Sequence, residues 1–376
     1  MERRKRVNWR DIAASRNSYA ALYAACERSG YTLYPVDRPT HDITCYSLNS
    51  LSASRYLREI EESECITVVG GPHASARFAD LTKIADYVVV GEGEYTLPAL
   101  LSYLDGRRPT LPPGVATGDG YTPTPYSVLL GSYPPFSEMK GYLEISRGCP
   151  FGCGYCQTPR IFGRCMRHRP IDQIVTYARK FLQARFVSPN ALAYGSDGRV
   201  PRFGKVEALL RHLSGEIYFG TFPSEVRPEF VTDRSLELIT TYCANTRIQF
   251  GAQSGSDTVL KKLNRGHTVD DVVRAVELCR SHGLFPVVDL ILGFPFESAD
   301  DERLTLDLIR WIARSGRVHI HQFLPLPGTP LDGTVAHTLS ADAERVLGAL
   351  ARSGNLTGSW CDPQIRFSRN RSNDIA

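Results

Sequence analysis

Three closely spaced cysteines carry the clearest chemistry in this sequence. Cys149, Cys153 and Cys156 lie within the stretch RGCPFGCGYC, in a C-x3-C-x2-C spacing with glycines between them. Glycines allow a loop to fold back tightly, so three thiolates can converge on one centre. Thiolates are soft ligands that select zinc or iron–sulfur clusters. The spacing therefore predicts a metal centre.

The other seven cysteines are scattered along the chain. A structural zinc site is the main alternative for the cysteine loop, and it needs a fourth ligand, for which Cys165 is the nearest thiol. Scattered cysteines in a chain of 376 residues are not a disulfide framework and indicate a reducing compartment. We expect those outside the cluster to be small buried groups or bystanders: Cys26, Cys45, Cys65, Cys165, Cys243, Cys279 and Cys361.

The composition is that of a globular protein. Apolar residues make up 42% and charged residues 22%, and the length suits two or three domains. No stretch approaches the roughly 18 apolar residues of a membrane span, and the N-terminus lacks the pattern of a signal peptide. We therefore expect a cytoplasmic protein with no membrane partner. A formal charge of +4 is too slight to predict a nucleic-acid partner.

The first third of the chain has the pattern of an α/β domain. Short β-branched runs alternate with helical stretches, and residues 65–69 and 87–90 are continuous apolar runs that end in glycine. Such runs are typical of parallel strands that are buried on both faces. Residues 1–108 are therefore predicted to form a Rossmann-like domain. Residues 109–139 are dense in Pro, Gly and Thr and are predicted to be a linker.

Alternation of strands and helices resumes over residues 140–333. Six strand-like and five helix-like segments predict a partial (β/α)6 barrel of the TIM type, with its ligand site at the carboxyl ends of the strands. The cysteine loop directly follows the first of these strands, at residues 142–146. Residues 334–376 are expected to form a short C-terminal helix and a tail.

The cysteine loop, with the aromatic Tyr155 just before its third cysteine, resembles the hallmark of the radical S-adenosylmethionine (SAM) superfamily. The resemblance implies that Cys149, Cys153 and Cys156 bind three irons of a 4Fe–4S cluster. The amino and carboxylate groups of SAM would chelate the fourth iron, and Tyr155 would lie near the adenine. Reduction by an electron donor such as ferredoxin or flavodoxin would then release a 5′-deoxyadenosyl radical.

Later segments resemble the same superfamily in the same order. They are QFGAQSGSD (249–257), LNRGHT (263–268), LILGFPFE (290–297) and QFLPLPGTPL (322–331). The usual Gly-Gly-Glu segment after the second strand is replaced by FVSPN (186–190). With Tyr155, the residues that the resemblance implies for SAM binding are Glu225, Arg227, Gln253, Ser254, Leu292, Gly293 and Leu324. For Glu225 and Arg227, the alternative to SAM binding is an ion pair at the protein surface.

The first domain resembles the cobalamin-binding domain that precedes many radical SAM enzymes. The segments that carry the resemblance are YSLN, GGPH and GEG. The loop that supplies a histidine ligand to cobalt in relatives of methionine synthase is absent, so His73 is expected to be a polar neighbour of the corrin. The implied cobalamin-binding residues are Tyr46, Ser47, Leu48, Asn49, Gly70, Gly71, Pro72, His73, Gly91, Glu92 and Gly93.

Together the two domains resemble cobalamin-dependent radical SAM methyltransferases, which transfer a methyl group from methylcobalamin to unactivated carbon. Two phrases, SPNALAYGSDG and TFPSEVRPEF, resemble the methanogen enzymes that methylate the α-carbon of a glutamine in methyl-coenzyme M reductase. This implies a peptide or protein substrate and a post-translational modification. One alternative is an enzyme that methylates or cyclises a small molecule. Another is a non-catalytic iron–sulfur or cobalamin sensor.

Overall fold

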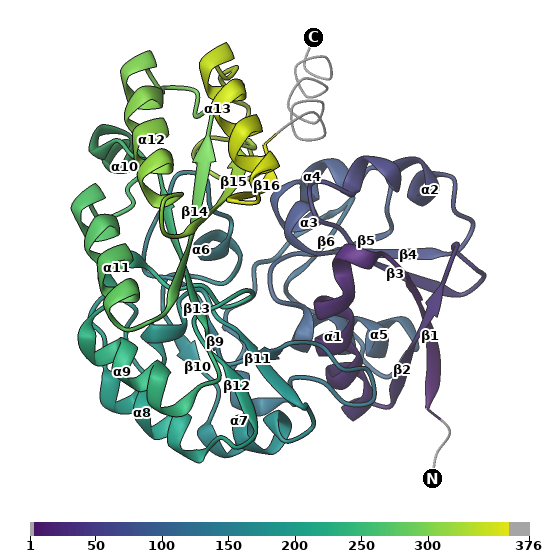
Figure 1. Cartoon of the computed structure of the whole chain (residues 1–376). Coiled ribbons are helices and arrows are strands. Elements are labelled where there is room, and N and C mark those ends of the chain that lie inside the picture. The colour runs from purple at the N-terminus through teal and green to yellow at the C-terminus, as the bar shows by residue number, and fades with distance from the viewer. Residues whose placement is uncertain (1–3, 361–376) are drawn as a thin grey trace. The chain divides into compact units, whose positions relative to one another are not determined.

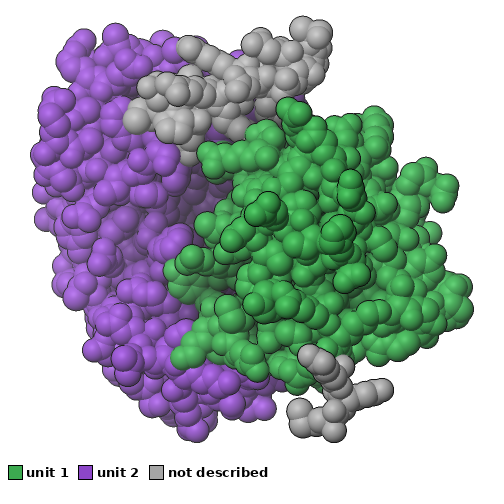
Figure 2. Space-filling view, turned by 90° about the vertical axis from the view of Figure 1, so that its right-hand side faces the viewer, with its two compact units in different colours: residues 1–143, 160–163 green, residues 144–159, 164–376 purple. Residues whose placement is uncertain are grey.

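The computed structural model describes residues 4–360, so Cys361 and the rest of the expected tail lie outside the described residues. The chain divides into two compact units (Figure 2). Unit 1 contains residues 1–143 and 160–163, and unit 2 contains residues 144–159 and 164–376. Across the described part of the chain, no helix has the length and apolar character needed to cross a membrane.

Unit 1 is built on a seven-stranded sheet with the strand order β2-β1-β3-β4-β5-β6-β7 (Figure 1). The first five strands in this order are parallel, as the alternation of strands and helices predicts. The strands are β1 (Lys5–Arg10), β2 (Tyr31–Val36), β3 (Ile43–Ser47), β4 (Ile66–Gly70), β5 (Tyr87–Val89), β6 (Val115–Thr117) and β7 (Gly120–Tyr121). The helices are α1 (Arg16–Arg28), α2 (Leu57–Glu61), α3 (Pro72–Ala76), α4 (Phe78–Leu81) and α5 (Gly93–Leu104).

The central strands of unit 1 are buried on both faces, as their apolar sequences predict. Val68 belongs to a core cluster that also contains residues of α1 and α5. Its neighbour Val69 belongs to a second cluster, which contains residues of α2, α3 and α4. Because successive residues of a strand point to opposite faces, helices cover both sides of the sheet. This is the arrangement expected of a Rossmann-like domain.

The segment 109–139 is not a free linker. It supplies β6, which pairs antiparallel with β5, and β7, which pairs antiparallel with β6. Val115 and Ala116 are buried in the two core clusters, so this stretch extends the sheet of unit 1. Runs of two or three residues are too short to show a strand period among prolines and glycines, which is why the sequence pattern hid them.

Unit 2 contains the six predicted barrel strands, divided between two sheets with the orders β12-β11-β8 and β13-β14-β15-β16. A bridge between Val226 and Phe250 joins the segment after β12 to β13. A seventh strand, β16, pairs with β15, so residues 356–359 of the expected tail are part of the sheet. The strands of these two sheets are β8 (Leu143–Glu144), β11 (Gln183–Val187), β12 (Glu216–Tyr218), β13 (Arg247–Gln253), β14 (Phe285–Leu292), β15 (Arg317–Gln322) and β16 (Leu356–Ser359).

Several helices of unit 2 begin at residues with strong capping chemistry. Thr232, Thr268 and Ser298 each form a capping box at the start of α9, α11 and α12, which satisfies backbone N–H groups of the first turn. These helices lie on the outer side of the strands (Figure 1). The helices are α6 (Thr158–Ile161), α7 (Ile171–Ala178), α8 (Phe203–His212), α9 (Asp233–Tyr242), α10 (Asp257–Lys262), α11 (Val269–Ser281), α12 (Ala299–Ile312) and α13 (Ala341–Arg352).

Candidate metal centre and neighbouring sites

The three cysteines of the loop line one pocket of about 100 Å³ in unit 2. The loop lies between β9 (Ser146–Arg147) and β10 (Arg167–His168), which pair antiparallel and close its base. The pocket is lined by Cys149, Pro150, Phe151, Cys153, Cys156, Thr158, Pro159, Met166, Pro189, Asn190, Ala193, Gly198, Arg227 and Arg265. The predicted metal ligands therefore share one cavity at the end of the first barrel strand.

Two of the later segments hold the loop in place. The backbone N–H of Gly154 donates to the carbonyl of Leu263 at 2.9 Å, and the carbonyl of Gly154 accepts from Leu331 at 3.3 Å. The side-chain amide of Gln157 donates to the carbonyl of Pro327 at 2.8 Å. The LNRGHT and QFLPLPGTPL segments are thus brought to the cysteine loop, although they lie more than a hundred residues away in the chain.

Arginines supply positive charge beside the thiols. A guanidinium nitrogen of Arg265 lies 3.7 Å from the sulfur of Cys153, and the guanidinium of Arg227 lies 3.6 Å from the centre of the Phe151 ring. Burial raises the pKa of Cys149 and that of Cys156. Metal binding requires thiolates, so a bound metal and these cations both favour the deprotonated form.

The pocket suits a cluster better than a single zinc ion. Cys165, the fourth ligand that zinc would need, is exposed and is not among the lining residues. Among residues 4–360, no three His, Cys, Asp or Glu side chains are grouped closely enough to hold one ion. In a 4Fe–4S cluster each thiolate binds its own iron, so the thiols need a common cavity rather than a common point. The three thiols fit this requirement.

Asn190 is a pocket residue to which the sequence assigned no role. It follows β11, at the end of FVSPN, and only 4% of its surface is exposed. Both polar atoms of its amide, Oδ1 and Nδ2, are buried without a hydrogen-bond partner. Unpaired buried amides are costly and uncommon, so a polar ligand in the pocket would complete this site. The sequence feature that could have pointed to Asn190 is the replacement of the usual Gly-Gly-Glu segment by FVSPN.

The predicted SAM-binding residues occupy three places in unit 2. Arg227 lines the cluster pocket itself. Tyr155 packs against Phe294, with ring centres 6.1 Å apart, in an apolar cluster after β14. Gly293 begins the turn there, with φ +83°, and its N–H donates to the carboxylate of Glu297 at 2.8 Å. The side chain of Leu292 is fully buried, whereas that of Leu324 is partly exposed.

The end of β13 carries two further candidates. Gln253 has a left-handed backbone, with φ +71°, at an irregularity in the pairing with β14. The hydroxyl of Ser254 lies 3.2 Å from that of Thr305 on α12, so this side chain anchors the strand end to a helix. Burial raises the pKa of Glu225 and also that of Asp289 on β14, the latter to about 8. Glu225 is not paired with Arg227, because the guanidinium of Arg227 instead contacts Glu229.

His267 is a buried histidine near Arg265 and Arg227. Burial, with Arg265 and Arg227 nearby, lowers its pKa from 6.5 to about 3, while Asp271 acts in the opposite direction. Its Nδ1 lies 3.7 Å from a carboxylate oxygen of Glu229. Because the folded state binds a proton less readily than the unfolded state, the stability due to neutral His267 is lost as the pH falls from 6.5 towards 3.

We expect this loss to approach about 1.4 kcal/mol per pH unit. It is checked by urea unfolding across that range in the wild type and in His267→Gln. The variant should lose part of the pH dependence that the wild type shows. Parallel curves for the two proteins would contradict the prediction.

The three predicted cobalamin loops of unit 1 are tied together at the strand ends. Leu48 donates its backbone N–H to the carbonyl of Gly70 at 2.8 Å, and its carbonyl accepts from His73 at 3.1 Å. The hydroxyl of Ser75 donates to the carbonyl of Gly71 and accepts from the N–H of Gly91, both at 2.9 Å. The loops after β3, β4 and β5 therefore form one continuous surface.

Gly71 is the tightest point of this surface. Its φ is +97°, and an added Cβ would lie 2.7 Å from the carbonyl oxygen of Leu48 and 3.0 Å from the hydroxyl of Ser47. At Gly91, with φ +83°, an added Cβ would meet nothing within 4 Å. The loops at Gly71 and Leu48 thus approach each other closely, while the space beside Gly91 is open. This combination fits a large ligand at the strand ends, as in other doubly wound sheets.

The remaining predicted cobalamin residues play mixed parts. The side chains of Tyr46 and Leu48 are buried in the core of unit 1. Asn49 accepts a hydrogen bond from the N–H of Ser52, and Glu92 accepts one from the N–H of Val128. Pro72 begins α3, and Gly93 begins α5. The side chains of Tyr46, Leu48, Asn49 and Glu92 are thus already engaged within unit 1.

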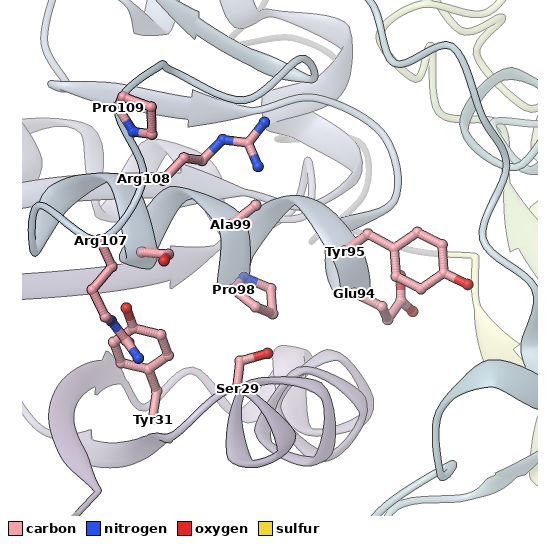
Figure 3. A pocket seen from close by; sticks show the side chains of 10 residues that line it. Ser29, Tyr31, Glu94, Tyr95, Pro98, Ala99, Arg107, Arg108 and Pro109 are labelled. Carbon is pink, nitrogen blue, oxygen red and sulfur yellow. The ribbon is translucent and has the colours of Figure 1, made fainter.

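A separate cavity of about 520 Å³ lies between α1 and α5 (Figure 3). Arg107 lies over the ring of Tyr31, 4.7 Å from its centre, and pairs with Asp105. The guanidinium of Arg108 donates to the carbonyl of Thr110. The two arginines that line this cavity therefore already have partners within unit 1.

Comparison with known proteins agrees with these observations. Residues 143–309 match the model of the radical SAM superfamily. The fold resembles that of the radical SAM methyltransferase TsrM from Kitasatospora setae, with a TM-score of 0.67 and 16% identity over 87% of this chain and 75% of that chain. It also resembles OxsB, a cobalamin-dependent SAM radical enzyme, with a TM-score of 0.63 and 15% identity over 99% of this chain and 61% of that one.

Curated relatives are similar in sequence but longer. An uncharacterised protein of Methanopyrus kandleri is 26% identical over 74% of this chain and 64% of its own length. A putative methylthiotransferase of Methanocaldococcus jannaschii is 25% identical over 69% of this chain and 61% of its own. A tRNA methylthiotransferase of Thermotoga maritima is 28% identical, and the match covers 54% of this chain and 48% of the relative. Residues 143–309 therefore match a radical SAM domain, which implies a 4Fe–4S cluster and SAM.

Proposed function

We propose that this protein is a cobalamin-dependent radical SAM methyltransferase that acts on an unactivated carbon. The observation that carries the proposal is the presence of two sites in one chain. A pocket with three thiols lies at the strand ends of the radical SAM domain. A glycine-lined surface lies at the strand ends of a Rossmann-like unit. The similarity of fold to TsrM and OxsB, which extends over most of the chain, supports the pairing.

Each group of residues has a defined part in this proposal. Cys149, Cys153 and Cys156 would hold the cluster, and Asn190 and Arg227 would orient the amino-acid end of SAM in the same pocket. The loops around Gly71 and Gly91 would hold cobalamin. When bound, the cluster and SAM supply a radical that takes a hydrogen atom from the substrate, and cobalamin supplies a methyl group. The apolar cluster of Tyr155 and Phe294 would exclude water from the adenine.

The substrate that we propose is the α-carbon of a glutamine in methyl-coenzyme M reductase, so the reaction would be a post-translational modification. The basis is the likeness of SPNALAYGSDG and TFPSEVRPEF to methanogen enzymes. The first phrase contains Asn190, and the second contains Glu225 and Arg227, so both border the cluster pocket or its strand ends. A ferredoxin or flavodoxin would supply the electron.

The test is an anaerobic assay with the cluster-loaded protein, SAM, a reductant and cobalamin. Its substrate is a peptide that carries the glutamine. The expected product is heavier by one methylene unit, and the gain is absent when cobalamin is omitted. A protein that cleaves SAM but leaves every tested peptide unchanged would exclude this substrate. A protein that binds iron but no cobalamin would exclude the whole proposal.

Methylthiolation of tRNA is a second candidate, because several curated relatives are named as methylthiotransferases. The same assay with tRNA in place of the peptide separates the two. Methylthiolation adds a sulfur atom together with a methyl group, so nucleoside mass spectrometry distinguishes it from methylation. Cobalamin dependence of the product would favour methyl transfer.

Asn190→Ala should weaken SAM binding about 10-fold, because a lost hydrogen bond to a charged group costs roughly 1.5–3 kcal/mol. Asn190→Asp keeps an acceptor oxygen and should retain most of the affinity for the SAM amino group. The measurement is a SAM titration of the cluster-loaded protein, followed by the change in its electron paramagnetic resonance (EPR) spectrum. Equal affinities for wild type and Asn190→Ala would remove Asn190 from the site.

A further inference from the structure

Arg265 stands beside one of the three thiols of the metal centre. Its Nη1 lies 3.7 Å from the sulfur of Cys153, within the range of a hydrogen bond to sulfur. Its Nη2 donates to the carbonyl of Gly251 at 3.0 Å. The second bond fixes the plane of the guanidinium, so Nη1 points to the sulfur rather than sampling the pocket.

The backbone of Arg265 is held as firmly as its side chain. It follows α10, and its N–H donates to the carbonyl of Leu260 at 3.0 Å. Its carbonyl accepts a hydrogen bond from the guanidinium of Arg227, whose planar group rests on the ring of Phe151 in the cysteine loop. Two arginines are thus connected to each other and to the loop, and only Arg265 reaches a ligand sulfur.

A cation at a ligand sulfur acts on the redox equilibrium of the cluster. Reduction adds one negative charge to a centre that already carries three thiolates. A nearby guanidinium offsets that charge, and charge interactions are strong in a partly buried site. Hydrogen bonds to ligand sulfurs and the local net charge are two factors that set iron–sulfur potentials.

We propose that Arg265 raises the reduction potential of the cluster through its hydrogen bond to Cys153. The inference rests on the cluster of the radical SAM domain and deepens the proposed function. Arg265 is a positioning residue, because it acts through Cys153 and not on the substrate. Its role is to let the electron donor reduce a cluster that would otherwise need a stronger reductant.

The experiment is a redox titration of the cluster-loaded protein, followed by EPR. SAM is left out so that its carboxylate cannot bind the guanidinium of Arg265. Arg265→Gln removes the charge at similar length, and we expect a more negative midpoint potential than that of the wild type. Arg265→Lys restores the charge and should recover part of the shift. The matched control is Arg199→Gln, since Arg199 also borders the cysteine loop but donates to the carbonyl of Pro150.

A shift in Arg265→Gln no larger than that in Arg199→Gln would overturn the inference. A second measurement needs no variant and therefore does not depend on cluster assembly in a mutant. In wild-type protein whose arginines carry heavy-isotope guanidinium nitrogens, pulsed EPR of the reduced cluster should detect a weak nitrogen coupling. Absence of the coupling overturns the inference as well. Failure of the proposed function would instead appear as missing methyl transfer with both redox results intact.

Discussion

Replacement of Cys149, Cys153 or Cys156 by Ser should abolish SAM cleavage and most of the iron content. The three thiols line one pocket in the described part of the chain, and each would bind a separate iron. When one thiolate is removed, its iron lacks a protein ligand, is exposed to solvent and dissociates. The measurements are iron and sulfide analysis, the visible absorption of the cluster, and the release of 5′-deoxyadenosine under reducing conditions.

Cys165→Ser is the matched control for this prediction. Cys165 lies nine residues after Cys156 in the sequence, is exposed and does not line the pocket. We expect the iron content and the SAM cleavage of the Cys165→Ser variant to equal those of the wild type. A loss in Cys165→Ser comparable to that in the three loop variants would show that the fourth thiol is a ligand, and would favour the zinc alternative.

Gly71→Ala should abolish cobalamin binding while leaving the iron–sulfur cluster intact. A Cβ at this position would lie 2.7 Å from the carbonyl oxygen and 2.9 Å from the nitrogen of Leu48, and neither backbone atom can move without disturbing the loop after β3. The backbone of Gly71, with φ +97° and ψ −179°, is in a region that essentially only glycine adopts, which adds a cost of about 1–3 kcal/mol. The measurement is the visible spectrum of bound cobalamin after gel filtration, alongside iron analysis.

Gly106→Ala is a control for a glycine with a positive φ and no close contact. Gly106 has a similar left-handed φ of +79°, but an added Cβ would meet nothing within 4 Å, and the residue lies after α5, away from the strand-end loops. This variant should lose only about 1 kcal/mol of stability and should bind cobalamin normally. Cobalamin binding equal to the wild type in Gly71→Ala would remove the strand-end surface from the proposal.

The fold was predictable to the extent that its elements carry a clear period. The doubly buried strands β4 and β5 and the helices α11 and α12 show apolar patterns long enough to identify. The strands β6, β7, β10 and β16 were missed, because each lies among Pro, Gly or polar residues and has no continuous apolar run. Their pairing is set by neighbouring strands and not by their own sequence.

The candidate site was predictable where its residues are close in sequence. The cysteine spacing alone identified three residues that line one pocket. Asn190 and Arg265 were within segments that the sequence singled out, yet no role could be assigned to either. Their importance depends on contacts with residues far along the chain: the unpaired amide of Asn190 faces a pocket built from several loops, and Arg265 reaches Cys153 from the end of α10.

By itself, the sequence determined the type and spacing of three candidate ligands: thiols in a radical SAM pattern, placed after the first strand of an alternating α/β domain. The spacing of residues along a loop is a local property, so it can be recognised without knowledge of the fold. Only the tertiary structure decided what surrounds the thiols, because burial and hydrogen bonding arise from segments brought together by packing. It placed Arg265 against Cys153, left the amide of Asn190 unpaired in the pocket, and put Cys165 outside it.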